Sequence, residues 1–345
     1  MSDQAPTSAG IVSARPELGG GAATPSFDLP AAAGSGLPGR PAPLRIGPAT
    51  FDWGSRTFVM GILNVTPDSF SGDGLLIVPG VASGAGPAAH SDPVEAAVAL
   101  GRRMAQEGAD LLDIGGESTR PGHETVADAD EIARVVPVVR ALRAALPAMS
   151  LSVDTTKVAV AAAALDAGAD IVNDVWGVAD DDDLLRLAAE RGVPIVLMHN
   201  RAEARYTNLM AEIVADLERA IERALACGVG WDAIVVDPGF GFGKTAAHNL
   251  VLLRELAALQ VLGRPILLGT SRKSTLGKVL DLPADQRLEA TLATTALGVA
   301  AGVDIVRVHD VQPNLRAARM ADAVSRASVS TPAATTGGPA DGGTP

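Results

Sequence analysis

The chain of 345 residues has few aromatic side chains and a single cysteine. Phe, Trp and Tyr make up only 3% of the sequence, so the core must be built mainly from Ala, Val, Leu and Ile. Because Cys227 has no second cysteine to pair with, an internal disulfide is excluded, which fits a reducing cytoplasm. Its surroundings, ALACG, follow a helical pattern in which we expect a structural thiol.

The sequence also lacks an excess of basic residues and a long apolar run. The formal net charge is −12, whereas nucleic-acid-binding proteins usually carry a basic face, so we expect no nucleic-acid partner. No uncharged apolar run reaches the roughly 18 residues that a membrane span needs. The first residues lack the basic region and apolar core of a signal peptide. We therefore expect a cytoplasmic protein without a membrane partner.

Composition divides the chain into three parts. Residues 1–45 and 328–345 are rich in Ala, Gly, Pro, Ser and Thr, which predicts a disordered leader and a disordered tail. The intervening residues 46–327 have enough apolar side chains for one large core. A single barrel of roughly 250 residues fits this length.

Eight short apolar segments in the central part each lead into a polar or charged residue, and helix-like stretches separate most of them. Buried parallel strands have such continuous apolar patterns. The alternation predicts an α/β fold, a TIM (β/α)8 barrel, whose catalytic groups lie at the C-terminal ends of the strands. The eight segments are 58–65, 110–118, 151–155, 170–175, 194–200, 233–241, 265–273 and 304–310.

Two connections differ from ordinary barrel turns. The stretch RIGPATFDWGSRTF before the first segment predicts a short N-terminal hairpin, with its turn near the WG pair, that plugs the bottom of the barrel. Residues 66–91 form a long connection with little expected structure. Long loops inside compact domains are usually functional or disordered, so we expect a mobile lid over the site.

Three segments end in groups that suit a flat heterocycle. Asp154, Asn173 and Asp237 close the third, fourth and sixth segments and should point into one axial cavity. Carboxylates accept hydrogen bonds from ring NH and amino groups, and an amide both donates and accepts. A set of divalent-metal ligands is the alternative, although no histidine joins them at ligand spacing. Met198, near the end of the fifth segment, is a candidate for apolar packing against such a ligand; His199 beside it is either catalytic or structural.

The last two segments supply basic groups. GTSRKS places Lys273 and Ser274 after the seventh segment, and VRVHD places Arg307 and His309 on one face of the eighth. The loops after strands seven and eight form the recurrent phosphate site of this fold. With Asn64, which closes the neighbouring first segment, Arg307 and His309 predict a diphosphate site. The alternatives are a solvated basic rim and a turn-forming asparagine.

Two loops could line a further part of the site. In DIGGESTRPG, Thr119 and Arg120 could contact an anion and Pro121 would stiffen the loop. In GFGFGK, which lacks the P-loop spacing, Phe242 is a candidate wall for an aromatic ring, and we assign Phe240 to the core. The acids Asp113 and Glu117 are either site residues or hydrogen-bonding groups of the barrel interior.

Taken together and in order, these segments resemble the dihydropteroate synthases of the pterin-binding family, a match that covers nearly all of 55–315. The resemblance implies a transferase of folate biosynthesis. Such an enzyme condenses 6-hydroxymethyl-7,8-dihydropterin diphosphate with p-aminobenzoate, two small-molecule substrates, to give 7,8-dihydropteroate and diphosphate. The matching segments are MGILNVTPDSFS, DIGGESTRPG, SVDT, IVNDV, VLMH, DPGFGFGKTAAHNL, LGTSRKS and VRVHDV.

The resemblance also implies roles for individual residues, with Asp154, Lys273, Arg307 and His309 as catalytic. Pterin would be bound by Asp154, Asn173, Met198, Asp237, Lys273 and Arg307. Diphosphate would be bound by Asn64, Thr119, Arg307 and His309. The p-aminobenzoate side would comprise Phe70, Thr119, Arg120, Pro121, Phe242 and Ser274, where sulfonamides should compete.

The resemblance further implies Mg²⁺ held near Asn64 and a homodimer formed through the late helices. The chain departs from the family pattern at SFSGDG (69–74), where the family usually has SFSDGG, so that Asp73 is displaced as a metal ligand. Two alternatives stay open. One is a non-catalytic pterin-binding paralogue, and the other is a methyltetrahydrofolate-dependent methyltransferase domain that shares the Asp–Asn–Asp set.

Overall fold

A computed structural model describes residues 41–66, 92–117, 126–179 and 181–326. Eight parallel strands lie in the order β8-β7-β6-β5-β4-β3-β10-β9. A parallel bridge between Val236 and Ile266 joins the two ends of this order, which closes the barrel. The predicted (β/α)8 barrel is therefore confirmed. Its strands are β3 (Phe58–Asn64), β4 (Leu111–Gly115), β5 (Ser150–Asp154), β6 (Ile171–Asp174), β7 (Ile195–Met198), β8 (Ile234–Asp237), β9 (Leu267–Leu268) and β10 (Ile305–Val308).

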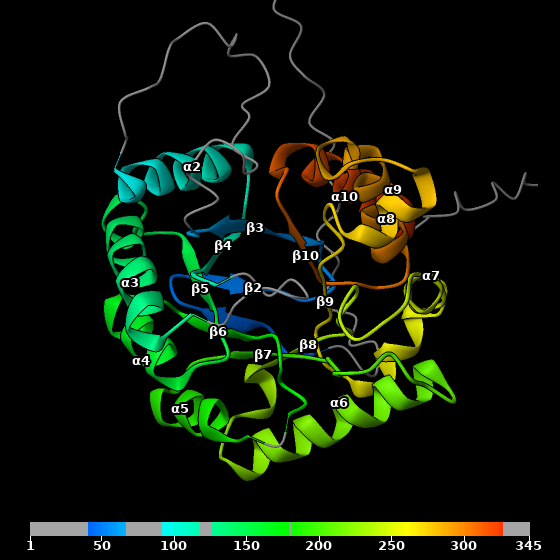
Figure 1. Ribbon diagram of the computed structural model, residues 1–345, viewed down its shortest axis with the longest axis horizontal. Coiled ribbons are helices and arrows are strands. Elements are labelled where there is room, and N and C mark those ends of the chain that lie inside the picture. The colour runs from blue at the N-terminus through cyan, green and yellow to red at the C-terminus, as the bar shows by residue number, and fades with distance from the viewer. Residues whose placement is uncertain (1–40, 67–91, 118–125, 180, 327–345) are drawn as a thin grey trace, which may run out of the picture.

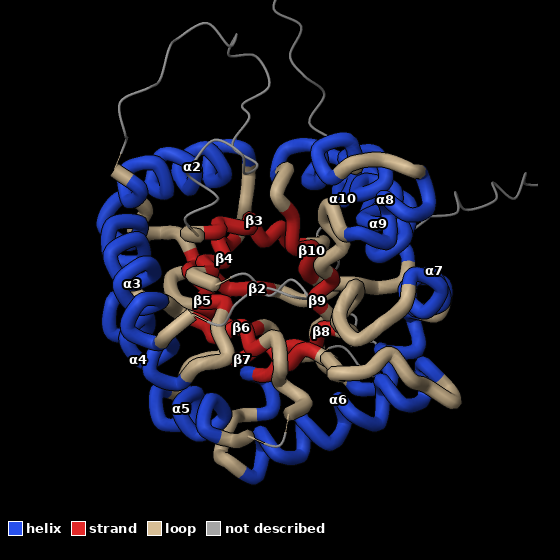
Figure 2. The backbone as a smooth tube through the Cα atoms, in the orientation of Figure 1, coloured by secondary structure: helices blue, strands red, loops and turns tan. Residues whose placement is uncertain are grey.

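Helices form an outer ring around the strands, as Figures 1 and 2 show. Several begin and end as their sequence signals predict. Pro93 opens α2 behind Asp92, whose carboxylate accepts a hydrogen bond from the Val94 amide at 3.0 Å, and Gly108 ends the helix in the left-handed conformation. The helices are α2 (Pro93–Glu107), α3 (Asp128–Ala145), α4 (Val158–Ala167), α5 (Asp183–Arg191), α6 (Leu209–Ala226), α7 (Ala246–Arg254), α8 (Ser274–Leu280), α9 (Leu288–Ala300) and α10 (Val311–Ser325). Short 3₁₀ turns span η1 (Trp231–Ala233), η2 (Leu256–Leu262) and η3 (Ala284–Gln286).

An N-terminal hairpin of β1 (Leu44–Ile46) and β2 (Ala49–Phe51) packs against the N-terminal ends of the barrel strands. Phe51 and Trp53 are almost fully buried there, beside inward-facing residues such as Met60 and Leu111. The predicted plug is therefore confirmed. Its turn, however, lies at residues 47–48 and not near the WG pair, because Gly47 supplies the positive φ of 57° that a tight turn needs. The folded part also begins at Leu44, slightly before residue 46.

The strand register brings polar residues into one row at the opposite end. Asn64 of β3 lies opposite Gly115, Gly115 lies opposite Asp154, and Asp154 lies opposite Asn173. Neighbouring residues in a parallel sheet point to the same face, so the side chains of this row share the barrel interior. The interior thus changes from an apolar plugged bottom to a polar top.

Some expectations fall outside the described residues, among them the predicted lid over most of 66–91, the predicted disordered leader up to residue 40 and the predicted disordered tail. Within the described part of the chain, no helix is both long and apolar enough to cross a membrane.

Candidate active site

Arg307 of β10 is the centre of the polar end of the barrel. Its Nε donates to Oδ2 of Asp113 at 2.5 Å, and its Nη2 donates to Oδ2 of Asp154 at 2.5 Å. Burial opposes its charge, but the two carboxylates raise the pKa of Arg307 above its usual value. The guanidinium is therefore a fixed cation that ties β10 to β4 and β5.

Asn173 joins the same cluster, because its Nδ2 donates to Oδ2 of Asp113 at 3.0 Å. Asp113 Oδ1 and Asp154 Oδ1 are buried and accept no hydrogen bond from the described residues. Buried acceptors without partners are costly, and a ligand that donates hydrogen bonds would satisfy them. The structure thus brings Asp154, Asn173 and Arg307 together as predicted, and it makes Asp113 a central member of the site.

Burial raises the pKa of Asp154 to about 7, in spite of the nearby Arg307. Burial likewise raises the pKa of Asp237, whose Oδ1 accepts a hydrogen bond from the Gly239 amide at 2.7 Å. Met198, at the end of β7, lies opposite Asp237 in the register and is almost fully buried. The two carboxylates therefore lie in surroundings of low polarity, where an acceptor without a hydrogen-bond donor is costly.

Lys273 follows β9 and contacts the loop after β8. Its Nζ donates to the carbonyl oxygen of Phe240 and lies 3.9 Å from the ring centroid of Phe242. Burial lowers the pKa of Lys273 to about 7, against the attraction of Asp237 and Asp154. Phe240 is fully buried in the core, as expected, so that Phe242 is the aromatic ring beside the lysine. Ser274 begins α8 and is exposed.

The loop after β9 and the loop after β10 are joined by two pairs of residues, Ser271 with His309 and Arg272 with Asp310. The amide of His309 donates to Ser271 Oγ at 3.2 Å, and the same Oγ lies 2.9 Å from His309 Nδ1. Since this hydroxyl accepts from the amide, its own proton can go to Nδ1, which leaves the imidazole proton on Nε2. Arg272, at a positive φ of 56°, pairs through both Nε and Nη2 with Asp310, at 3.0 and 2.6 Å.

Gly115 separates Asn64 from Asp154. A Cβ at Gly115 would lie 3.7 Å from both Asn64 Oδ1 and Asp154 Oδ2, so its absence leaves room between the two side chains. Among the described residues, no group of three or more His, Cys, Asp or Glu side chains is placed to hold a metal. A hard cation at Asn64 would therefore depend on oxygen atoms of a substrate as well as on the carboxamide.

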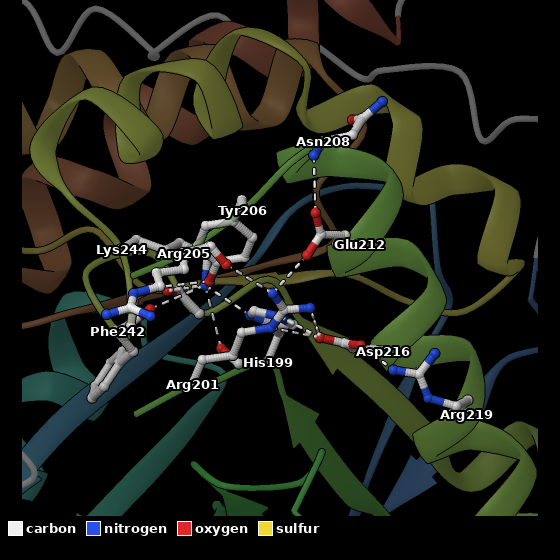
Figure 3. A network of polar contacts seen from close by, with 12 residues as sticks. His199, Arg201, Arg205, Tyr206, Asn208, Glu212, Asp216, Arg219, Phe242 and Lys244 are labelled. Atoms are coloured by element: carbon white, nitrogen blue, oxygen red, sulfur yellow. Dashed lines mark hydrogen bonds and ion pairs between the residues drawn. The ribbon is translucent and has the colours of Figure 1, made fainter. Parts of the chain in front are cut away.

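His199 is not directed at this site. It is fully buried, and its Nε2 lies 3.1 Å from Asp216 Oδ2 on α6 (Figure 3). Of the two readings of His199, the structure therefore favours the structural one. Five predicted site residues lie outside the described part of the chain: Phe70, Asp73, Thr119, Arg120 and Pro121.

The sequence patterns missed three residues of this region. Ser271 orients His309, and Gly115 leaves space between Asn64 and Asp154. Lys244 donates a hydrogen bond to the backbone carbonyl oxygen of Phe242. A signal for Lys244 was present, because lysine is rare in this chain and this one follows three glycines in GFGFGK. No pattern in the sequence indicates that Lys244 contacts His199.

Comparison with known proteins decides the family. A family model described as pterin binding enzyme matches residues 60–309. The chain belongs to the pterin-binding enzyme family. It is 45% identical over 284 residues to a dihydropteroate synthase of Clostridium beijerinckii, an alignment that covers 82% of this chain and all of that protein.

Solved structures of dihydropteroate synthases are similar in fold as well. The enzyme from Clostridium difficile, determined in the presence of pteroic acid, is 46% identical with a TM-score of 0.73 and covers 80% of this chain and 99% of its own. The enzyme from Xanthomonas albilineans in complex with 7,8-dihydropteroate is 39% identical with a TM-score of 0.71, covering 82% of this chain and 98% of its own. The similarity therefore spans the barrel and its polar end.

Proposed function

We propose that this chain is a transferase that condenses 6-hydroxymethyl-7,8-dihydropterin diphosphate with p-aminobenzoate and releases 7,8-dihydropteroate and diphosphate. One observation carries the assignment of the site. Arg307 binds Asp113 and Asp154 inside the barrel, while one oxygen of each carboxylate has no partner among the described residues. A pterin ring, rich in NH donors, supplies the hydrogen bonds that these oxygens need.

In this proposal the pterin lies in the polar end of the barrel. Asp154, Asn173 and Asp237 form hydrogen bonds to the ring edge, and Lys273 donates to a ring acceptor. Met198 and Arg307 pack against the faces of the ring, which the flat guanidinium suits. The low polarity around Asp154, which raises its pKa to about 7, strengthens each of these hydrogen bonds.

The reaction breaks the C–O bond between the pterin methylene and the diphosphate. The bonding electrons leave with the diphosphate, and the electron-rich dihydropterin stabilises the cationic methylene, which Asp154 faces as an anion. The amine nitrogen of p-aminobenzoate then forms the new C–N bond and loses one proton to solvent or to the departing diphosphate. Arg307 and His309, through its Nε2 proton, stabilise the charge on the leaving group.

Mg²⁺ is the cofactor that we propose. The carboxamide oxygen of Asn64 is a hard donor at the open space over Gly115, which fits Mg²⁺ shared with substrate phosphates. Bound there, the ion would offset the charge of the diphosphate. Thr119 is proposed as a further diphosphate ligand. The shifted position of Asp73 in SFSGDG argues against it as a metal ligand.

We propose that p-aminobenzoate lies beside Lys273 and Phe242. The support is the 3.9 Å approach of the Lys273 ammonium to the Phe242 ring, which forms one wall next to the pterin side chains. Ser274, exposed at the start of α8, would contact the carboxylate of the substrate. Phe70, Arg120 and Pro121 complete this side of the proposal, and sulfonamides, as mimics of p-aminobenzoate, should compete for it.

A homodimer through the late helices is also proposed. Large apolar side chains are exposed there, with Leu297 of α9 at 57%, Met320 of α10 at 66% and Val324 of α10 at 73%. Exposed apolar side chains that gather on packed helices are typical of subunit interfaces. We place the enzyme in the cytoplasm because its single cysteine suits a reducing compartment.

A steady-state assay tests the function. Purified full-length chain is mixed with the pterin diphosphate, p-aminobenzoate and Mg²⁺, and release of diphosphate and formation of dihydropteroate are measured. We expect turnover that a chelator abolishes and that Asp154→Ala removes. Pterin binding without turnover would instead support the non-catalytic paralogue, and methyl transfer from methyltetrahydrofolate would support the methyltransferase domain.

A further inference from the structure

Lys244 is an ammonium group enclosed by the loop that precedes it in the chain. Its Nζ donates to the carbonyl oxygens of Gly239 and Phe242, both at 3.1 Å, and reaches the carbonyl oxygen of His199 at 3.5 Å. The Nδ1 atom of His199 lies 2.8 Å away (Figure 3). None of these partners carries a negative charge, so the hydrogen-bond partners of Lys244 among the described residues are neutral acceptors. Accordingly, burial lowers its pKa to about 7.

The histidine is fixed as one of these acceptors. Asp216 Oδ2 lies 3.1 Å from His199 Nε2 and receives both Nε and Nη2 of Arg201, at 3.0 and 2.7 Å. These contacts keep Asp216 ionised and lower its pKa in spite of burial, so it accepts the proton of Nε2. The remaining lone pair of the neutral imidazole, on Nδ1, then faces Lys244.

Three glycines allow the loop to fold around the lysine. Gly239 and Gly243 have φ values of 67° and 53°. A Cβ at Gly239 would lie 1.8 Å from the carbonyl oxygen of His199, and one at Gly243 would lie 2.4 Å from that of Arg201. Gly241, at φ 85°, leaves space for the Lys273 side chain, 2.7 Å from where its Cβ would be. The loop thus lies close against the segments that follow β7 and β9.

The same loop contacts the groups assigned to both substrates. The Gly239 amide donates to Asp237, Phe240 offers its carbonyl oxygen to Lys273, and the Phe242 ring lies against the Lys273 ammonium. In Figure 3 the Phe242 ring points away from the Lys244 network, whereas its backbone carbonyl belongs to that network. Lys244 therefore fixes the backbone from which the aromatic wall projects.

We propose that Lys244, held by neutral His199, is a positioning residue for the p-aminobenzoate side of the site and acts through the backbone of Phe242. This inference rests on the function proposed above. Lys244 contacts neither substrate itself. Its loss should release Phe242. The pterin side chains of β5, β6 and β10 should stay in place, since their contacts do not involve the loop. Asp237 and Lys273 do contact the loop, so we expect a smaller effect on the pterin side rather than none.

The test compares Lys244→Met with Lys278→Met, the same change at an exposed lysine of α8. Both variants are assayed with full-length protein and Mg²⁺, with each substrate varied in turn. For Lys244→Met we expect the KM of p-aminobenzoate to rise about tenfold, while kcat and the KM of the pterin diphosphate change less than threefold. Lys278→Met should match the wild type in kcat and in both KM values.

A KM for p-aminobenzoate equal to that of the wild type, in folded Lys244→Met protein, would overturn the inference. Equal loss in kcat and in both KM values would also overturn it, because that pattern marks a general structural defect. If Lys244→Met does not fold, His199→Phe keeps the lysine and its carbonyl partners and removes the Nδ1 acceptor, together with the Nε2 donor to Asp216. A rise of about threefold in the KM of p-aminobenzoate is then expected, and no rise would contradict the proposal.

Failure of the proposed function gives a different result, namely no turnover by the wild type. The positioning role is then measured by hydrogen exchange of the backbone amides. We expect faster exchange over residues 239–244 in Lys244→Met, and unchanged exchange in Lys278→Met. Unchanged exchange over residues 239–244 in Lys244→Met would show that the lysine does not hold the loop.

Discussion

Arg307 and Asp113 are 194 residues apart in the chain, yet Nε of the arginine donates to Oδ2 of the aspartate over 2.5 Å inside the barrel. Asp113 is fully buried, and the Arg307 side chain is 16% exposed. A charged pair of this kind is costly to leave half-formed, since the remaining charge has no solvent to stabilise it. The pair therefore makes the polar end of the barrel sensitive to single substitutions.

Arg307→Met should lower the free energy of unfolding by about 3 kcal/mol, because it leaves the carboxylates of Asp113 and Asp154 without their cation. Urea denaturation at pH 8 measures the change. Arg254→Met, at a side chain that is 72% exposed, is the matched control and should cost less than about 1 kcal/mol. A loss below about 1 kcal/mol for Arg307→Met would show that the pair contributes little.

Pterin binding should depend on the ionisation of Asp154. Its pKa is raised by burial from 3.8 to about 7, so the carboxyl group is protonated below pH 7 and becomes an ionised acceptor as the pH rises. We expect the Kd of a pterin without a diphosphate group to rise by up to about tenfold per pH unit below 7. Titration calorimetry from pH 6 to 8 measures this, and Asp154→Asn should flatten the dependence. An equally steep dependence in Asp154→Asn would assign the titration to another group.

The hairpin plug should stabilise the fold without taking part in catalysis. Phe51 is 1% exposed, and its ring centroid lies 4.8 Å from that of Phe58 and 5.6 Å from that of Trp53. Phe51→Ala removes this packing and should lower the free energy of unfolding by about 3–5 kcal/mol. Both KM values should stay within twofold of the wild type below the unfolding temperature. A large change in either KM would contradict the separation between the plugged end and the polar end.

Neutral His199 should make stability fall in mild acid. Burial lowers its pKa from 6.5 to about 3, so an unfolded chain takes up a proton below pH 6.5 that the folded chain does not. The contribution to stability is complete above pH 6.5 and is lost as the pH falls toward 3, by up to about 1.4 kcal/mol per pH unit. Urea denaturation between pH 4.5 and 8 should show a smaller slope for His199→Phe. The same slope in both proteins would exclude His199 as its origin.

Much of the barrel could be predicted from the sequence, because each strand carries its own local signal. Continuous apolar runs that end in Asn64, Asp154 or Asp237 mark buried parallel strands, and their number fixes the closed fold. The predicted position of the hairpin turn is wrong because the sequence offers two turn signals, one at Gly47 and one at Gly54. Only Gly47 stands between the paired strands.

The pairing of residues within the site is harder to predict from the sequence. Asp113 lies within β4 and Asp154 ends β5, and only the direction of Arg307 makes both of them its partners. The role of His199 also stayed open, since a histidine after a strand can point into the barrel or toward the helices. Its contact with Asp216 on α6 depends on how the helix packs, which no local pattern encodes.

The sequence by itself determined the strands, their polar ends and the types of chemical group at the site, because periodicity and residue type act locally. The tertiary structure alone decided which groups pair, which carboxylate oxygens remain without partners, and how Lys244 holds the loop of Phe242. The physical reason is that burial and charge pairing arise between residues far apart in the chain. Closing the barrel brings Arg307 to Asp113 and Asp154 and removes the cluster from water, and this burial raises the pKa of Asp154 to about 7.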